Sequence, residues 1–270
     1  MEKDRIGMRN NRGVALIIVL LVTALMIALI FEFAYGTRVS LHAAVNFRDS
    51  QRAYFLARSG FGVFARFPEL RSYILQGELG TVPYVSEGDR ELRMLWEDES
   101  GKITVAAIAK GNDAYNRLTK LFDILQNDHD KLDQMSTWMM EEQRGLSLIT
   151  ELHRFLNDEE YGKVAGFLTV HTTGKININT ASSKVLQCLG LSAPDADSIV
   201  ESAKREPFDP GKKPINNAPG MTPLIAGQLV VSSNVFKVSS IATVGGYTKQ
   251  IDAIMTLNVP GFTVNYWRAI

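Results

Sequence analysis

Closely spaced carboxylates are the side chains of this sequence that could do chemistry. Three groups could supply metal ligands or paired acids: Asp128, Asp130 and Asp133; Glu141 with Glu142; and Asp195 with Asp197. Calcium binding requires several oxygens that converge from one loop, and the first group lacks the glycine turn and closing glutamate of an EF-hand. We interpret all three groups as helix starts or surface clusters, and we predict no metal site and no cofactor.

A fourth acidic pair, Asp98 with Glu99, could act as two catalytic carboxylates. The pair follows a segment in which Leu92 and other apolar residues alternate with polar ones, and a second alternating segment begins at Ile103. Gly101 stands between them, which is typical of a turn that needs a positive φ. We predict a β-hairpin over residues 90–109, with the two carboxylates at its solvated tip.

The remaining nucleophiles and bases form no catalytic or zinc-binding pattern. The sequence has no phosphate-binding loop, dinucleotide-binding glycine motif or nucleophile elbow. Its four histidines, at positions 42, 129, 153 and 171, are scattered. Cys188 cannot form an internal disulfide and lies in an apolar helical pattern, so we expect it to be buried. We predict a protein that is not an enzyme and has no small-molecule substrate.

Leu189-Gly190-Leu191 predicts a tight turn between two short helices, 182–189 and 192–204. Such a helix-hairpin-helix grips phosphate with backbone amides in DNA-binding proteins, and that use needs basic support. Here the charge is mixed, since four acidic residues oppose two basic ones: Asp195, Asp197, Glu201 and Glu206 against Lys204 and Arg205. The whole chain is balanced as well, with 29 basic and 29 acidic residues. We do not expect nucleic acid as a partner, although a membrane-tethered DNA-binding protein remains an alternative.

The N-terminal segment predicts a membrane anchor. Residues 1–13 are polar and carry four basic side chains against two acidic ones, and the next eighteen residues carry no charge and only one polar side chain, Thr23. At ~1.5 Å per residue this run spans roughly 27 Å, close to the ~30 Å hydrocarbon core. The preceding basic residues favour a cytoplasmic N-terminus, so the chain after about Tyr35 is exported.

Three interpretations of this segment compete. A cleaved secretory signal would have a shorter apolar core and a small-residue cleavage site, which the sequence after Phe31 does not offer. A plain signal anchor fits the physics. A prepilin-type leader, cut between Gly13 and Val14 on the cytoplasmic side, is favoured because the basic leader ends at a glycine followed at once by the apolar run.

Helical spacing continues beyond the membrane. Seven residues recur at intervals of three and four: Ala43, Phe47, Ser50, Tyr54, Ala57, Phe61 and Phe64. We predict one helix over residues 14–66; the alternative is a membrane helix followed by a separate amphipathic helix. Further along, helices are predicted within 113–163, a strand over 167–171, a helix from Thr222, a hairpin over 235–259 around Gly245-Gly246, and an edge strand over 262–267. Strands therefore flank a helical block, which indicates a sheet with a helical insertion.

Several blocks of this sequence resemble general secretion pathway protein K, a family of minor pseudopilins of bacterial type II secretion systems. They lie at 12–17, 51–60, 98–103, 174–181 with the following Leu186 and Ala196, 236–238 and 244–246. The most specific block is Gly-Lys-Ile-Asn-Ile-Asn-Thr-Ala at 174–181. The resemblance implies a pilin-like α+β fold with a long N-terminal helix, a small antiparallel sheet and an inserted helical domain. The predicted domains are a leader (1–13), a transmembrane helix (14–34), a pilin-like helix and first hairpin (35–110), a helical insertion with the helix-hairpin-helix-like pair (111–230) and C-terminal strands (231–270).

The resemblance also implies function and partners. Prepilin peptidase would cut after Gly13, and the new amine of Val14 would be methylated. The protein would sit in the inner membrane with a periplasmic domain and would help to initiate and cap the pseudopilus. Its partners would be minor pseudopilins I and J, with H and the major pseudopilin as further candidates. A minor pilin of a type IV pilus, which shares the leader and helix, is the alternative.

Position 18 bears on the tip role. Most pilin-like subunits carry a glutamate five residues into the mature chain, which neutralises the terminal amine of a neighbour; here that residue is Ile18. A first subunit has no such amine to neutralise, so an apolar residue suits it. Small residues in the same run would allow partner helices to approach closely: Ala15, Thr23, Ala24 and Ala28.

One departure from the family concerns metal. Family members carry an Asp-Trp-Ile-Asp stretch whose counterpart here, 137–140, is Thr-Trp-Met-Met and lacks both aspartates. The calcium sites of the family are therefore not carried over to this chain.

Overall fold

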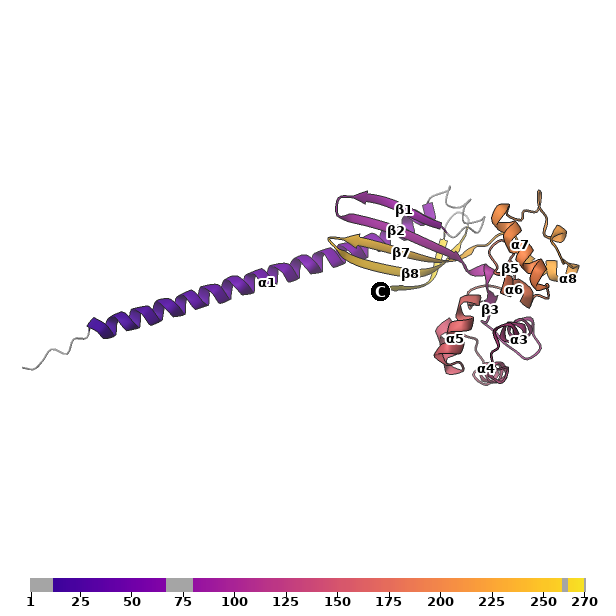
Figure 1. Ribbon diagram of the computed structural model, residues 1–270, viewed down its shortest axis with the longest axis horizontal. Coiled ribbons are helices and arrows are strands. Elements are labelled where there is room, and N and C mark those ends of the chain that lie inside the picture. The colour runs from indigo at the N-terminus through magenta and orange to yellow at the C-terminus, as the bar shows by residue number, and fades with distance from the viewer. Residues whose placement is uncertain (1–11, 67–79, 259–261, 270) are drawn as a thin grey trace, which may run out of the picture. The chain divides into compact units, whose positions relative to one another are not determined.

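The computed structural model describes residues 12–66, 80–258 and 262–269 (Figure 1). The chain divides into two compact units, Met1–Arg52 and Ala53–Ile270. The boundary at residue 52 separates regions that pack within themselves. The predicted boundary at residue 34 marks the end of the apolar membrane segment instead, so the two are not the same kind of boundary. The domain division given above therefore stays a prediction.

Helix α1 runs without a break from Arg12 to Arg66, which confirms one long helix rather than two (Figure 1). By length and composition, the segment Gly13–Gly62 of this helix is able to cross a membrane. The apolar side chains of residues 14–31 are exposed in the described unit. An apolar surface of this kind is unfavourable in water, so lipid or another protein must cover it.

The second unit contains a five-stranded antiparallel sheet in the order β1-β2-β7-β8-β9 (Figure 1). Its strands are β1 (Gly80–Glu87), β2 (Arg90–Asp98), β7 (Val235–Val244), β8 (Tyr247–Leu257) and β9 (Phe262–Ala269). The C-terminal hairpin and the final edge strand are thus confirmed. Because β2 pairs with β7, with Leu92 opposite Ala242, the helical region is inserted between two adjacent strands.

The last turns of α1 pack on one face of this sheet. Ala57 and Phe61 lie in a core with Leu92, Met94 and Trp96, which alternate along β2 as predicted. The predicted helical face is only partly correct. Ala43 and Phe47 are exposed, Ser50 and Tyr54 are half-buried, and the side chain of Phe64 lies outside the described residues.

The inserted region has its own core. Its helices are α3 (Asp113–Leu125), α4 (Asp130–Glu141), α5 (Asp158–Val164), α6 (Ser183–Cys188), α7 (Ala193–Arg205) and α8 (Pro223–Ala226). Two short parallel pairs join them: β3 (Ile103–Thr104) with β4 (Leu168–Thr169), and β5 (Ile176–Asn177) with β6 (Leu229–Val230). Ser182, Ser192 and Thr222, where the predicted helices begin, are the observed N-caps: each accepts a hydrogen bond from a first-turn amide of α6, α7 or α8.

The predicted hairpin over 90–109 is wrong. Strand β2 pairs with β1 and β7, and the chain after it enters a short 3-10 helix, Glu99–Gly101, and then β3. Alternation along β2 correctly identified its buried face, but it does not specify which strand lies beside it. Gly101 is not among the residues with positive φ. It is needed instead for close approach, since a Cβ there would lie 2.9 Å from the carbonyl oxygen of Thr180.

Candidate assembly surface and polar junction

The residues predicted for processing and assembly all lie on the exposed N-terminal part of α1. Gly13 and Val14 are in its first turn, and Ile18, one turn further on, is 57% exposed. Ala24 and Ala28 are four residues apart and share one helix face. Ala15 lies on the opposite face from Ala24, because nine residues correspond to two and a half turns.

Thr23 is compatible with a lipid or helix-packed environment. Its hydroxyl donates to the carbonyl oxygens of Val19 at 2.9 Å and Leu20 at 3.0 Å. The only polar side chain of the run is thus satisfied within its own helix, as a membrane segment requires. The surface of residues 14–31 can therefore be covered entirely by apolar partners.

Two carboxylates of the first acidic group, Asp128 and Asp133, accept hydrogen bonds from protein groups. Asp133 accepts hydrogen bonds from the hydroxyl of Tyr115 at 2.6 Å and from Nζ of Lys110 at 3.2 Å. These two contacts hold the pKa of the Asp133 carboxyl below its usual range. Asp128 accepts the backbone amide of Asp130 at 2.9 Å.

Asp195 likewise accepts the hydroxyl of Ser192 at 2.6 Å. Within residues 13–62, 88–258 and 262–269, where side chains are described, no three histidine, cysteine or acidic side chains gather as a metal site would require.

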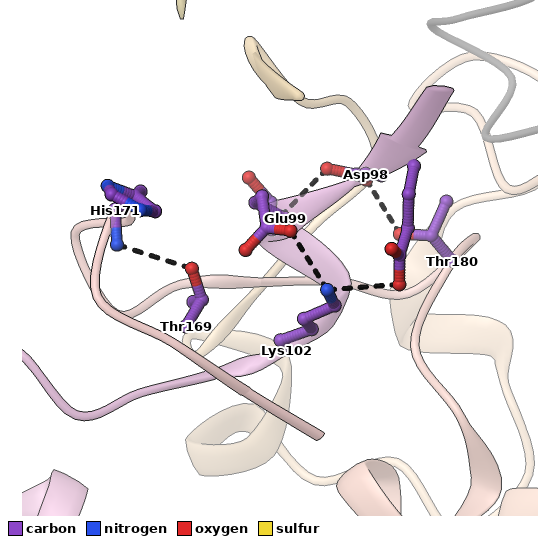
Figure 2. Close-up of polar contacts among 8 residues, drawn as sticks. Asp98, Glu99, Lys102, Thr169, His171 and Thr180 are labelled. Atoms are coloured by element: carbon purple, nitrogen blue, oxygen red, sulfur yellow. Dashed lines mark hydrogen bonds and ion pairs between the residues drawn. The ribbon is translucent and has the colours of Figure 1, made fainter. Parts of the chain in front are cut away.

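Asp98 and Glu99 are buried, so the predicted solvated tip is wrong. Asp98 is 8% exposed and Glu99 is 4% exposed. Asp98 accepts hydrogen bonds from the amide of Ser100 at 2.8 Å and from Nδ2 of Asn177 at 2.8 Å. It also accepts a hydrogen bond from the hydroxyl of Thr180 at 2.7 Å (Figure 2). The end of β2 folds against the 174–181 segment instead of turning into solvent, because that segment supplies the donors that a buried carboxylate needs.

Lys102 balances the second buried carboxylate. Its Nζ lies 2.8 Å from Oε1 of Glu99 (Figure 2). The same Nζ lies 3.0 Å from Oε1 of Glu97. Burial alone would lower the pKa of Lys102, but the two carboxylates outweigh it and the pKa is raised. His171 lies near this pair, and burial, partly offset by Glu99, lowers its pKa.

We refer to Asp98, Glu99, Lys102, Asn177 and Thr180 together as the polar junction. The contacts of Asp98 with Asn177 and Thr180 hold the end of strand β2 against the inserted region, and the Glu99–Lys102 ion pair lies directly after that strand. Sequence reasoning missed this junction. The available signal was that its residues fall in two of the blocks, 98–103 and 174–181, on which the family resemblance rests.

The predicted helix-hairpin-helix is present as α6 and α7, with Gly190 at φ +106°. The amides of Leu189 and Gly190 donate to the carbonyls of Leu186 and Gln187, so neither is free for a phosphate. Cys188 is buried as predicted, and burial raises the pKa of its thiol to about 12.

Comparison with solved structures finds this fold in a chain of the GspK-GspI-GspJ complex from the type 2 secretion system of enterotoxigenic Escherichia coli. The TM-score is 0.56, with 16% sequence identity, over 87% of this chain and 99% of that chain. No family model matches this sequence, and no curated protein matches it. The structural likeness confirms the expected fold: a long apolar N-terminal helix, a small antiparallel sheet and an inserted helical region.

Proposed function

We propose that this chain is a minor pseudopilin that helps to initiate and cap the periplasmic pseudopilus of a type II secretion system. The observation that carries the proposal is the exposed apolar surface of residues 14–31 on a helix that continues into a pilin-like domain. A surface of this size must be covered, and in a fibre it is covered by the helices of neighbouring subunits. The fold shared with the secretion complex supports the same role.

Processing makes the transfer from membrane to fibre possible. Prepilin peptidase would cut between Gly13 and Val14 and so remove the leader, which has a net positive charge. The freed helix then begins with an apolar run and can leave the lipid without carrying the leader's charges through it. Methylation of the new amine on Val14 would follow.

The tip position rests on Ile18. A subunit within the fibre shaft would need a carboxylate at this position to neutralise the amine of its neighbour, whereas the first subunit has no such neighbour. Ile18 is exposed and apolar in α1, so it presents no charge to the bilayer or to a partner. The face shared by Ala24 and Ala28 would contact the helices of minor pseudopilins I and J, and contacts with H and the major pseudopilin would follow as assembly proceeds.

The proposed location is the inner membrane, with one span, a cytoplasmic N-terminus and a periplasmic domain. Mass spectrometry of the mature N-terminus in protein from cells tests the proposal. We expect the chain to begin with N-methylated Val14. Gly13→Leu should block processing, whereas Gly36→Leu, at an open position of the same helix, should not. Finding functional protein that still begins with Met1 would overturn the proposal.

The nature of the partners separates this function from that of a type IV minor pilin. Cross-linking in cells, followed by isolation of the full chain from detergent, should recover minor pseudopilins I and J. Recovery of type IV pilus subunits in their place would favour the alternative.

A further inference from the structure

Arg117, on α3, is a buried cation without a hydrogen-bonded carboxylate. The residue as a whole is 6% exposed. Nη1 donates to the carbonyl oxygen of Gly174 at 2.6 Å and Nη2 donates to Oε1 of Gln228 at 2.8 Å. Its Nε–H is buried and has no hydrogen-bond partner. Both of its acceptors are neutral, so the positive charge of the guanidinium is not balanced by direct contact.

This arrangement is costly for a structural arginine. Buried charges are normally paired, and a guanidinium has the geometry to bind a carboxylate through two parallel hydrogen bonds. Burial lowers the pKa of Arg117, and Asp113, one turn earlier in α3, offsets this only in part. A residue that exists only to tie α3 to Gly174 and Gln228 would not need a charge.

Arg117 lines an open pocket of about 740 Å³. The pocket also includes Thr172, Thr173 and Lys175, and the N-terminal residues of α3. The hydroxyl oxygen of Thr172 is buried without a hydrogen-bond partner, like Nε of Arg117. Lys175 is exposed and makes no ion pair within the described part of the chain.

We infer that this pocket binds a single carboxylate group. The charged side chains that line it are Arg117 and Lys175 against Asp113, which leaves an excess of one positive charge for one monoanion. The N-terminus of α3, a helix of 13 residues, adds partial positive charge at the same place. The carboxylate of Asp113 would repel a second negative charge, so the pocket disfavours a dianion such as phosphate. The inference is independent of the proposed function.

The carboxylate could be free, as in acetate, or carried by a polypeptide, and binding experiments distinguish the two. The probes are sodium acetate, a glutamate residue blocked at both ends, the matching blocked glutamine as the neutral control, and inorganic phosphate. Each is titrated into the isotopically labelled full chain in detergent, and the amide signals of residues 172–175 are followed by NMR. We expect saturable shifts with the two carboxylates and none with blocked glutamine. Tighter binding of blocked glutamate would identify a polypeptide source, and tighter binding of acetate would identify a free acid.

Variants locate the binding site. Lys175→Gln, at an exposed position, should weaken binding by about two- to fivefold, the effect of one solvent-exposed charge. Lys212→Gln, exposed and outside the pocket, should leave binding unchanged. Arg117→Lys should abolish saturable carboxylate binding, because lysine keeps the positive charge but lacks the parallel N–H donors of the guanidinium. If Arg117→Lys fails to fold, Lys175→Gln still decides the question.

Three results with the parent protein would overturn the inference: no saturable response to either carboxylate, an equal response to blocked glutamine, or phosphate binding tighter than both carboxylates. An unchanged affinity in Lys175→Gln would do the same.

Discussion

Asp98 at the end of β2 accepts a 2.7 Å hydrogen bond from the hydroxyl of Thr180, which lies 82 residues further along the chain. The same carboxylate accepts the side-chain amide of Asn177. Gly101 makes room for this contact, because any Cβ at position 101 would collide with Thr180. One carboxylate and one glycine thus bring the strand end and the 174–181 segment together, and this pairing positions the inserted region on the sheet strand from which it departs.

Removing this carboxylate should destabilise the protein strongly. Asp98→Ala leaves the buried donors of Asn177 and Thr180 without an acceptor, so we expect a loss of about 2–4 kcal/mol in the free energy of unfolding. Chemical denaturation of the full chain in detergent, followed by tryptophan fluorescence, measures it. Glu91→Ala on the exposed face of β2 is the control and should change stability by less than about 1 kcal/mol. Equal losses in the two variants would contradict the assigned role of Asp98.

Two glycines of α1 should respond in opposite directions to the same substitution. A Cβ at Gly60 would collide with the hydroxyl of Ser240, which donates to the carbonyl of Ala57 at 2.7 Å. Gly60→Ala should therefore destabilise the protein by about 1–3 kcal/mol. Nothing lies near a Cβ at Gly62, where alanine should be neutral or stabilise the helix by about 0.5–1 kcal/mol. Thermal unfolding compares the two variants, and a stable Gly60→Ala protein would show that α1 does not pack on the sheet this closely.

The ion pair of the polar junction should be far more sensitive than an exposed pair of the same length. Lys102 and Glu99 are 13% and 5% exposed at the side chain, whereas Lys163 and Glu159 are 42% and 80% exposed; both pairs have an N–O distance of 2.8 Å. Lys102→Met leaves Glu99 as an unbalanced buried charge and should cost about 3–5 kcal/mol.

Lys163→Met is the matched control and should leave the denaturation midpoint nearly unchanged, because exposed ion pairs contribute little to stability. Denaturation midpoints of the two variants give the comparison. Replacing Glu99 by Gln in the Lys102→Met background should recover part of the loss, and a lack of recovery would mean that charge is not its cause.

The apolar residue at position 18 should determine where the chain enters the fibre. If the chain caps a pseudopilus as proposed, Ile18→Glu places a carboxylate in the bilayer without an amine to neutralise it at the tip, so we expect less initiation of pseudopili and some entry into the shaft. Ile18→Leu keeps the apolar character and should behave like the parent. Counting pseudopili, and labelling the protein along them, measures both effects. If Ile18→Glu initiates normally and stays at the tip, position 18 has no part in the choice.

Much of this fold was predictable because its signals are local. The spacing of three and four over residues 43–64, the helix starts at Ser182 and Ser192 and the Gly245-Gly246 turn are all signals between residues close in sequence. The long helix, the α6–α7 pair and the C-terminal hairpin followed from them. The hairpin predicted over 90–109 was wrong, because alternation marks a buried face in any sheet and does not specify which strand lies beside it.

The sequence by itself determined that the chain has a long apolar stem, a sheet and a helical insertion, because periodicity and capping act within single elements. Only the tertiary structure decided that β2 lies beside β7, that Asp98 and Glu99 are buried, and that Gly101 serves close packing instead of a turn. It also showed that Arg117 is a buried cation held by neutral oxygens. The physical reason is that the environment of a charge depends on segments distant in sequence, and these are brought together only when both cores form.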